Sequence, residues 1–243
     1  MPSKMRFIET IFLDAGNTMV SMDFAWIRAE LKRHDILCNI DDLMRAEAAA
    51  RPFFSANLNK LKSTEGQNAF TYYFKKILHK LEATSRMGDE EHDNIIHSIL
   101  PILQAPGANE RLWSFLLPGV KQGLDILRKK GYHLVVVSNS DGTVEKCLEN
   151  VGIRHYFNSV VDSGLVGFEK PDPRLFQYAL ELSGSVPEKT LHVGDMYHID
   201  ILGALSAGMH AILIDPFDDW KDVDCLKSPD LLSVARMLEN KIY

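Results

Sequence analysis

The stretch Ile11-Phe12-Leu13-Asp14-Ala15-Gly16-Asn17-Thr18-Met19-Val20 decides how the fold is interpreted. It passes from apolar residues to one acid, and then to small and polar residues. The apolar run predicts a buried strand, and residues 15–17 predict a turn out of it. Asp14 then lies at the carboxyl end of a strand, where open α/β sheets bind ligands. Taken alone, the stretch fits equally well an acid that begins a loop.

Composition limits the classes of protein to consider. The 243 residues are 46% hydrophobic and 25% charged, with a formal net charge of −6. This mildly acidic balance gives no electrostatic reason to bind nucleic acid or anionic membranes. The apolar runs are too short to span a bilayer, and the N-terminal segment does not resemble a signal peptide. Cys38, Cys147 and Cys225 lack metal-ligand spacing, which favours free thiols in the cytoplasm.

A long helical segment follows the opening strand. From about Asp23 to about Phe115 the apolar residues recur at helical spacing, and no strand pattern is convincing. The stripe from Phe70 to Leu81 indicates packing between helices, and Pro101 predicts the end of another helix. We therefore predict a bundle of four or five helices over residues 21–115.

Strands and helices alternate in the rest of the chain. Apolar runs predict strands, and amphipathic segments between them predict helices. The predicted strands cover residues 132–137, 157–161, 190–193 and 211–214, and the predicted helices cover 120–130, 143–151, 173–183, 199–207 and 231–239. This alternation predicts a Rossmann-like α/β core with a parallel sheet. The core consists of residues 1–20 and 116–243, so the helical bundle is an insertion.

Three predicted strands end in polar groups. Asp14 follows the first strand, Ser138-Asn139 follow the second, and Asp195 follows the fourth. Asp200 lies five residues beyond Asp195, and Lys170 precedes a helix. Since the carboxyl ends of parallel strands share one edge of a sheet, we expect these groups to converge.

This constellation resembles the haloacid dehalogenase superfamily. The resemblance covers residues 7–20 and 118–216 and consists of motifs in the family's order. The matching segments are Asp14–Thr18 (the family's Asp-x-Asp-Gly-Thr), Ser138, Lys170–Pro173, and Gly194-Asp195 with Asp200. The inserted bundle resembles the helical cap of subclass I. The resemblance implies hydrolysis of a small phosphorylated molecule, by a monomer or homodimer, with the cap as a lid.

The resemblance and the residue types together assign candidate catalytic roles. Asp14 is the candidate nucleophile, because a carboxylate can form a covalent aspartyl intermediate. Lys170 and Ser138 are placed to neutralise charge on the transferred phosphoryl oxygens. Thr18 and Asn139 are further candidates for contact with the phosphate.

A magnesium site is also implied. Mg²⁺ prefers oxygen ligands, and Asp14 and Asp195 are the candidate carboxylates. In the family the backbone carbonyl at the position of Gly16 is a ligand, and Asp200 is expected to support the ligands without direct contact. His192 and His198 are expected to be structural or rim residues.

Gly16 departs from the family pattern. Phosphatases of the family carry at this position a second Asp, which protonates the leaving oxygen. General acid–base help is typically worth about 10² to 10⁴ in rate. Gly16 cannot supply it, and neither can Asn17, which replaces the family's Gly. Asp141 is a candidate substitute acid, although a role at a helix N-terminus fits it better.

Three functions therefore stay open. The first is a Mg²⁺-dependent phosphatase that lacks the usual acid. The second is a dehalogenase or phosphonate hydrolase, the latter with a cap lysine such as Lys60 or Lys62; Asp195 argues against a metal-free dehalogenase. The third is a binding or regulatory protein with impaired turnover. Arg45, Arg51 and Lys60 are loose candidates for substrate contact.

Overall fold

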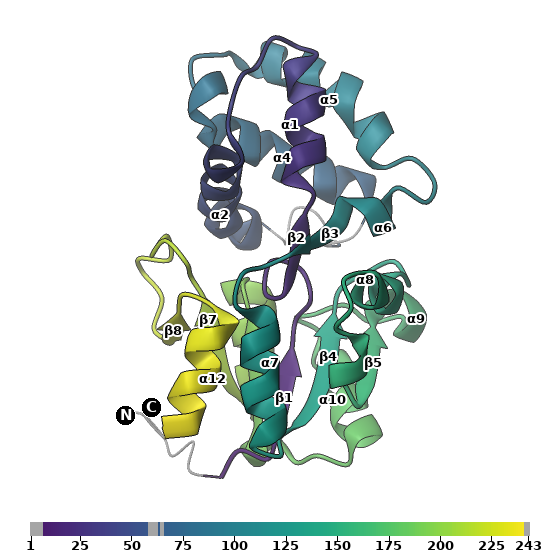
Figure 1. Ribbon diagram of the computed structural model, residues 1–243, viewed down its shortest axis with the longest axis vertical. Coiled ribbons are helices and arrows are strands. Elements are labelled where there is room, and N and C mark those ends of the chain that lie inside the picture. Colours follow the sequence, from purple (N-terminus) through teal and green to yellow (C-terminus); the bar gives the residue numbers. More distant parts are fainter. Residues whose placement is uncertain (1–6, 58–62, 64–65, 241–243) are drawn as a thin grey trace. The chain divides into compact units, whose positions relative to one another are not determined.

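The chain folds into two compact units (Figure 1). The computed structural model describes residues 7–57, 63 and 66–240. Met1–Ser21 and Leu116–Tyr243 form the first unit, called here the core unit, and Met22–Phe115 form the second, called the helical unit. In the described part of the chain, every helix is too short or too polar to cross a membrane.

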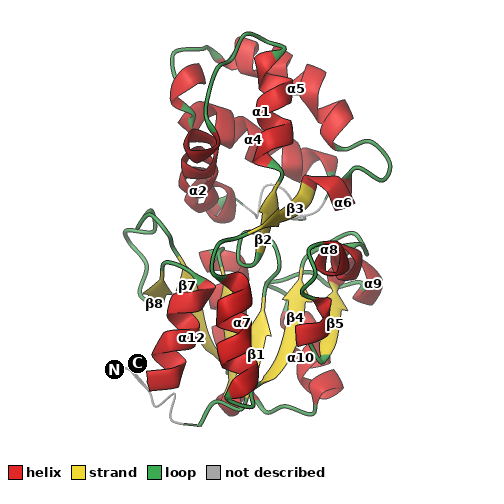
Figure 2. Ribbon diagram, in the orientation of Figure 1, coloured by secondary structure: helices red, strands yellow, loops and turns green. Residues whose placement is uncertain are grey.

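The core unit is built on a parallel sheet of six strands (Figure 2). Its strands are β1 (Thr10–Leu13), β4 (His133–Ser138), β5 (Ser159–Asp162), β6 (Thr190–Gly194), β7 (His210–Ile214) and β8 (Leu226–Ser228). They lie in the order β5-β4-β1-β6-β7-β8, and each neighbouring pair is parallel. This confirms the predicted α/β class and puts β1 between β4 and β6.

Helices cover both faces of this sheet. On one face α7 (Val120–Lys129) packs against α12 (Leu231–Asn240), as Figure 1 shows in front of the sheet. A Cβ at Gly123 would lie 3.1 Å from the Leu231 carbonyl oxygen, so glycine permits this close approach. The other face packs on α10 (Pro173–Ser183) and α11 (Leu202–Ser206), and it buries Phe12, Val135, Val137, Val161, Leu175, Phe176, Ala179, Leu180, Ala204 and Met209.

Short elements complete the core unit. They are α8 (Val144–Asn150), η2 (Arg154–Tyr156), α9 (Ser163–Val166), η3 (Pro187–Lys189) and a π-helical turn, η4 (Tyr197–Ile201). Strand β8 was not predicted, because Leu226–Ser228 is short, contains a lysine and lacks an apolar run. It is a strand because it pairs with β7, a segment that lies elsewhere in the chain, and sequence periodicity does not reveal such a pairing.

The helical unit contains α1 (Phe24–Lys32), α2 (Ile40–Ala56), α4 (Gln67–Lys80), η1 (Glu82–Thr84), α5 (Asp89–Leu103) and α6 (Asn109–Leu112). Side-chain caps set two of the helix starts. Asp23 accepts a hydrogen bond from Trp26 N, and Asn39 and Asp42 form a reciprocal capping box. The aromatic stripe of α4 is buried at Tyr73 and Phe74, which confirms its packing role.

The predicted helix end at Pro101 was wrong, because helix α5 continues through Pro101 to Leu103. Helix α2 likewise contains a proline, Pro52, in its interior. A proline removes one backbone donor, but packing of the buried face holds the rest of each helix together. Two short strands, β2 (Val20–Met22) and β3 (Trp113–Leu116), were also missed, and they pair with each other where the chain leaves and re-enters the core unit.

Candidate active site

Three neighbouring strands bring their polar ends together. Leu13 of β1 pairs with Val136 of β4 and with Val193 of β6. One residue further on, the backbone N–H of Asp14 donates to the Val193 carbonyl at 2.9 Å. Asp14, Ser138 and Asp195 therefore meet at the carboxyl edge of the sheet, as a parallel sheet requires.

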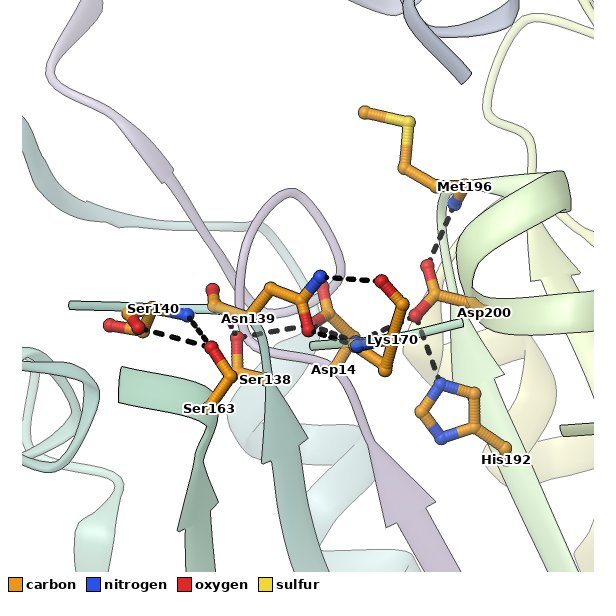
Figure 3. A network of polar contacts seen from close by, with 9 residues as sticks. All are labelled: Asp14, Ser138, Asn139, Ser140, Ser163, Lys170, His192, Met196 and Asp200. Carbon is orange, nitrogen blue, oxygen red and sulfur yellow. Dashed lines mark hydrogen bonds and ion pairs between the residues drawn. The ribbon is translucent and has the colours of Figure 1, made fainter. Parts of the chain in front are cut away.

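Lys170 joins the acidic residues at this edge of the sheet into one cluster, because its ammonium contacts both Asp14 and Asp200 (Figure 3). Its Nζ lies 2.6 Å from Asp14 Oδ1 and 2.7 Å from Asp200 Oδ1. Ser138 Oγ donates to the same Asp14 oxygen at 3.1 Å. The lysine side chain is only 1% exposed, so this ammonium is removed from water and depends on the carboxylates for its stability. The loop before α10 thus places the Lys170 ammonium between Asp14, which follows β1, and Asp200, which lies in the turn after β6.

Asn139 holds the backbone of Lys170 on both sides. Its Nδ2 donates to the Lys170 carbonyl at 2.9 Å, and its Oδ1 accepts from the Lys170 N–H at 2.7 Å (Figure 3). The predicted use of Asn139 was contact with the phosphate. In the structure its side-chain amide holds the backbone of Lys170, and contact with the phosphate stays a prediction.

Asp200 is buried and hydrogen-bonded through both carboxylate oxygens. Oδ1 accepts from Lys170 Nζ and lies 3.1 Å from His192 Nε2, while Oδ2 accepts from the N–H of Met196 at 2.9 Å (Figure 3). A Cβ at Gly194 would lie 2.3 Å from Asp200 Cγ, so only glycine leaves room for this carboxylate. His192 is fully buried, in agreement with its predicted structural role.

The turn after β6 aims Asp200 back at the strand end. Helical structure was predicted to begin near Ile199, but the first turn is the π-helical η4, followed by α11. Within it, the N–H of Asp200 donates to the carbonyl of Met196 at 2.7 Å. Single π-turns are frequent at functional sites, because the extra residue re-aims a side chain.

The loop after β1 folds back on itself. Asn17 N–H donates to the Val20 carbonyl at 2.7 Å, and Ser21 Oγ donates to Asn17 Oδ1 at 2.6 Å. Asn17 has φ +50°, a left-handed conformation that asparagine tolerates well, which explains how it can stand where the family has glycine. Thr18 is buried, and its hydroxyl has no hydrogen-bond partner among the described residues.

Asp162 is a structural determinant of the site that the sequence reasoning missed. It ends β5, and its carboxylate accepts hydrogen bonds from the N–H groups of Gly142, Gly164 and Val144 at 3.0, 2.9 and 3.2 Å. Asp162 is therefore the N-cap of α9, and its bonds to the N–H groups of Gly142 and Val144 fix the loop between Ser138 and α8. Asp141, the predicted residue for that end of the helix, is exposed and accepts from Thr143 Oγ1 instead. The sequence signal that was missed is an acid directly after the predicted strand at residues 157–161.

Burial and charge set the ionisation of the cluster. Burial raises the pKa of Asp14 above its usual value, and Lys170 only partly offsets this effect. Burial also acts to raise the pKa of Asp200, but Lys170 and His192 outweigh it and leave that pKa low. Burial acts to lower the pKa of Lys170, and the attraction of Asp14 and Asp200 raises it instead. Burial lowers the pKa of His192, which keeps the imidazole neutral.

The donor set fits a divalent cation. One carboxylate oxygen from each of Asp14, Asp195 and Asp200 lies within 4.8 Å of the others, and all three residues are buried. Among the described residues, the ammonium of Lys170 contacts this cluster, and it is shared between Asp14 and Asp200. Buried carboxylates in excess of their counter-ions repel one another, and a small oxygen-preferring cation relieves that repulsion.

The candidate substrate contacts in the helical unit differ in their surroundings. Arg51 is buried, and its guanidinium pairs with Glu47 on the same helix at 2.6 Å. Its contact with a substrate stays a prediction. Arg45 is exposed on α2. Lys60 and Lys62 lie outside the described residues.

Comparison with known proteins identifies relatives. The sequence pattern of the haloacid dehalogenase-like hydrolases matches residues 8–208. Haloacid dehalogenase-like hydrolase domain-containing protein 3 of Bos taurus is 42% identical over 106 residues, which cover 42% of this chain and 42% of the relative. Glyceraldehyde 3-phosphate phosphatase of Methanothermobacter thermautotrophicus is 45% identical over 100 residues, or 40% of this chain and 44% of the relative. The matches thus span about half the length of these curated relatives.

A solved structure resembles the whole chain. It is the HAD-hydrolase YfnB of Bacillus subtilis bound to magnesium, which superimposes with a TM-score of 0.65 at 19% identity. The superposition covers 96% of this chain and 99% of that one. At this identity the likeness shows the fold alone.

Proposed function

This chain belongs to the haloacid dehalogenase-like hydrolases, and on that premise we propose that it is a Mg²⁺-dependent phosphatase of a small phosphorylated metabolite. The observation that carries the proposal is the contact of Lys170 Nζ with Asp14 Oδ1 at 2.6 Å within a buried cluster of three acids. A nucleophilic carboxylate beside a fixed cation, in a site that can accept a further cation, suits the transfer of an anionic group.

The phosphatase chemistry is supported by a relative. The glyceraldehyde 3-phosphate phosphatase of Methanothermobacter thermautotrophicus shares 45% identity with this chain over the matched 100 residues. Asp195 also supports phosphatase chemistry. A third buried carboxylate is useful as a ligand in a metal site, whereas displacement of halide without a metal gains nothing from it. We therefore favour phosphoryl transfer over carbon–halogen hydrolysis.

Asp14 is the proposed nucleophile. A carboxylate oxygen of Asp14 attacks phosphorus, the bond from phosphorus to the leaving oxygen breaks, and an aspartyl-phosphate forms. Water then attacks the same phosphorus, the bond to Asp14 breaks, and inorganic phosphate departs. Lys170 and the Ser138 hydroxyl, which both contact Asp14 Oδ1, lie where they can stabilise the charge of the transferred oxygens.

The cation would be held by oxygen ligands at the strand ends. Asp14 and Asp195 would supply carboxylates, and Gly16 would supply its backbone carbonyl. Asp200 suits a supporting role, because both of its oxygens already accept hydrogen bonds from protein groups. When bound, Mg²⁺ offsets the excess negative charge and orients the phosphate.

Gly16 shapes the expected substrate preference. No side chain at this position can protonate the leaving oxygen, so the leaving group must depart as an anion or take its proton from water. Acyl phosphates, whose leaving groups are stable anions, should therefore react faster than alkyl phosphates. We further propose that the helical unit acts as a lid of the subclass I type and selects the substrate.

A panel assay on the full chain tests the proposal. Phosphate release from acyl phosphates and alkyl phosphomonoesters should require Mg²⁺, and Asp14→Asn should lower it by at least about 10⁴-fold. Asp125→Asn, which neutralises an exposed acid on α7, is the matched control and should be fully active. Turnover that survives EDTA would sink the Mg²⁺ mechanism. Mg²⁺ binding without turnover on any substrate would favour the regulatory alternative.

A further inference from the structure

A second group of potential metal ligands lies in the helical unit. It consists of His79 near the end of α4 and of Asp89 and His92 in the first turns of α5. One ring nitrogen of each histidine and one carboxylate oxygen of Asp89 lie within 4.8 Å of one another. The two imidazole rings meet edge to face, with centroids 4.4 Å apart. Nothing in the proposed phosphatase mechanism uses these residues.

The tautomer of His92 is fixed by its surroundings. His92 is fully buried, and its Nε2 lies 3.1 Å from the carbonyl oxygen of Thr84. A carbonyl can only accept, so Nε2 carries the proton and Nδ1 carries a lone pair. Among the described residues, this buried Nδ1 has no hydrogen-bond partner. A buried acceptor without a partner is costly, so this nitrogen needs an explanation.

The arrangement matches that of a metal-binding histidine. Such histidines usually donate their second ring N–H to a backbone carbonyl or a carboxylate, as His92 does to Thr84. His79 Nε2 lies 3.2 Å from Asp89 Oδ1. Two ligands bound to a tetrahedral zinc ion at about 2.0–2.1 Å stand about 3.3 Å apart, so this pair already has the required separation.

The charges around the group also need to allow a cation. Lys75 Nζ lies 3.7 Å from Asp89 Oδ1, but it is closer to Asp93 Oδ1, at 2.7 Å, which offsets its charge. Partial burial lowers the pKa of His79, and the neighbouring His92 lowers it further. Because Asp89 is exposed, solvent would reach the fourth coordination position of a tetrahedral metal ion bound here.

We propose that His79, Asp89 and His92 form a three-ligand site for Zn²⁺, with solvent as the fourth ligand. Imidazole nitrogen suits Zn²⁺ better than Mg²⁺, whereas the oxygen-only cluster of Asp14, Asp195 and Asp200 has the opposite preference. The ion would join the end of α4 to the start of α5. It would thereby stabilise the turn at residues 81–88 that connects them.

Metal titration of the full chain tests this site. With excess Mg²⁺ present to occupy the oxygen cluster, one equivalent of Zn²⁺ should bind and raise the melting temperature by about 5 °C at saturation. Co²⁺ as a probe should develop the strong visible absorption of four-coordinate cobalt with nitrogen ligands, whereas an all-oxygen six-coordinate site absorbs weakly.

Three variants make the result specific. His79→Gln and Asp89→Asn change partly or fully exposed side chains, so both proteins should fold, and each should weaken Zn²⁺ binding by about 10-fold or more. His97→Gln is the matched control, since His97 lies on the same helix, is exposed and contacts the Asp93 carbonyl instead. The proposal is overturned if Zn²⁺ binding is absent, or if all three variants bind it like the unaltered protein.

Discussion

The two units each bury a cluster of charged side chains, and the clusters differ in charge balance. In the helical unit, Arg51 contacts Glu47 through Nε at 2.8 Å and Nη2 at 2.6 Å, and the Tyr73 hydroxyl donates to the same carboxylate. One cation meets one anion in a bidentate pair, so the charges cancel within two turns of α2.

In the core unit two acids share one ammonium. Lys170 is shared between Asp14 and Asp200, and Asp195 adds a third buried carboxylate. A buried acid paired with a cation on its own helix serves the fold. Several buried acids that gather around one ammonium suit a site where a further cation binds. Burial alone does not distinguish the two clusters, whereas the way in which the buried acids share their cations does.

Removal of Lys170 should have the largest effect. Lys170→Met leaves three carboxylates without their internal cation, so the free energy of unfolding should fall by about 3–5 kcal/mol. Catalysis by the folded fraction should fall by about 10³-fold. Urea denaturation and phosphate release measure the two effects separately. Since Mg²⁺ replaces part of the lost charge, it should stabilise this variant more than the unaltered protein; equal stabilisation would contradict the charge argument.

Removal of Arg51 should cost stability alone. Arg51→Met leaves Glu47 as a buried charge without its cation, and the free energy of unfolding should fall by about 3 kcal/mol. The rate per folded molecule should stay unchanged, because Arg51 is buried among residues of the helical unit. The double variant with Glu47→Gln should recover most of the stability. A large loss of turnover at full folding would show that the balanced pair also serves catalysis.

Gly16→Asp should sharpen the comparison by adding an acid to the unbalanced cluster. If a proton donor is what the site lacks, alkyl phosphate hydrolysis should rise by about 10-fold or more, while acyl phosphate hydrolysis changes little. Gly16→Asn is the control, because its amide has similar size and cannot act as an acid. Equal rates for both variants would indicate that another group already protonates the leaving oxygen.

Asn139→Ala should give the smallest effect. It removes both hydrogen bonds that hold the Lys170 backbone and leaves the charges of the cluster unchanged. We expect a loss of about 1–3 kcal/mol in stability, and a fall in turnover well below that of Lys170→Met. Steady-state kinetics measures the fall in turnover. Asn139→Asp is the comparison variant, since aspartate keeps the oxygen that accepts from the Lys170 N–H. A loss as large as that of Lys170→Met would give Asn139 a direct role.

Much of the fold could be predicted because it rests on local patterns. The run at residues 190–193 and the helix at 173–183 are visible from apolar periodicity and a proline at the helix start, and they appear as β6 and α10. Strand β8 and the β2–β3 pair could not be seen. Each is short, and hydrogen bonds to a distant partner define it.

The site residues likewise fall into those that the sequence predicts and those that it does not. The strand-end positions of Asp14, Ser138 and Asp195 follow from the sequence, because parallel strands present their carboxyl ends at one edge. The positioning roles of Asn139 and Asp162 do not, since a side-chain amide or carboxylate shows no pattern that reveals its partner. Their contacts reach across 31 and 18 to 20 residues of chain.

The sequence by itself determined that an acid follows the first strand and that Gly16, which has no side chain to donate a proton, stands two residues later. Only the tertiary structure decided that Lys170, 156 residues away in the chain, shares its ammonium between Asp14 and Asp200. The physical reason is range. Periodicity and turn chemistry act over a few residues, whereas the charge balance of a buried cluster depends on which distant segments the fold brings together.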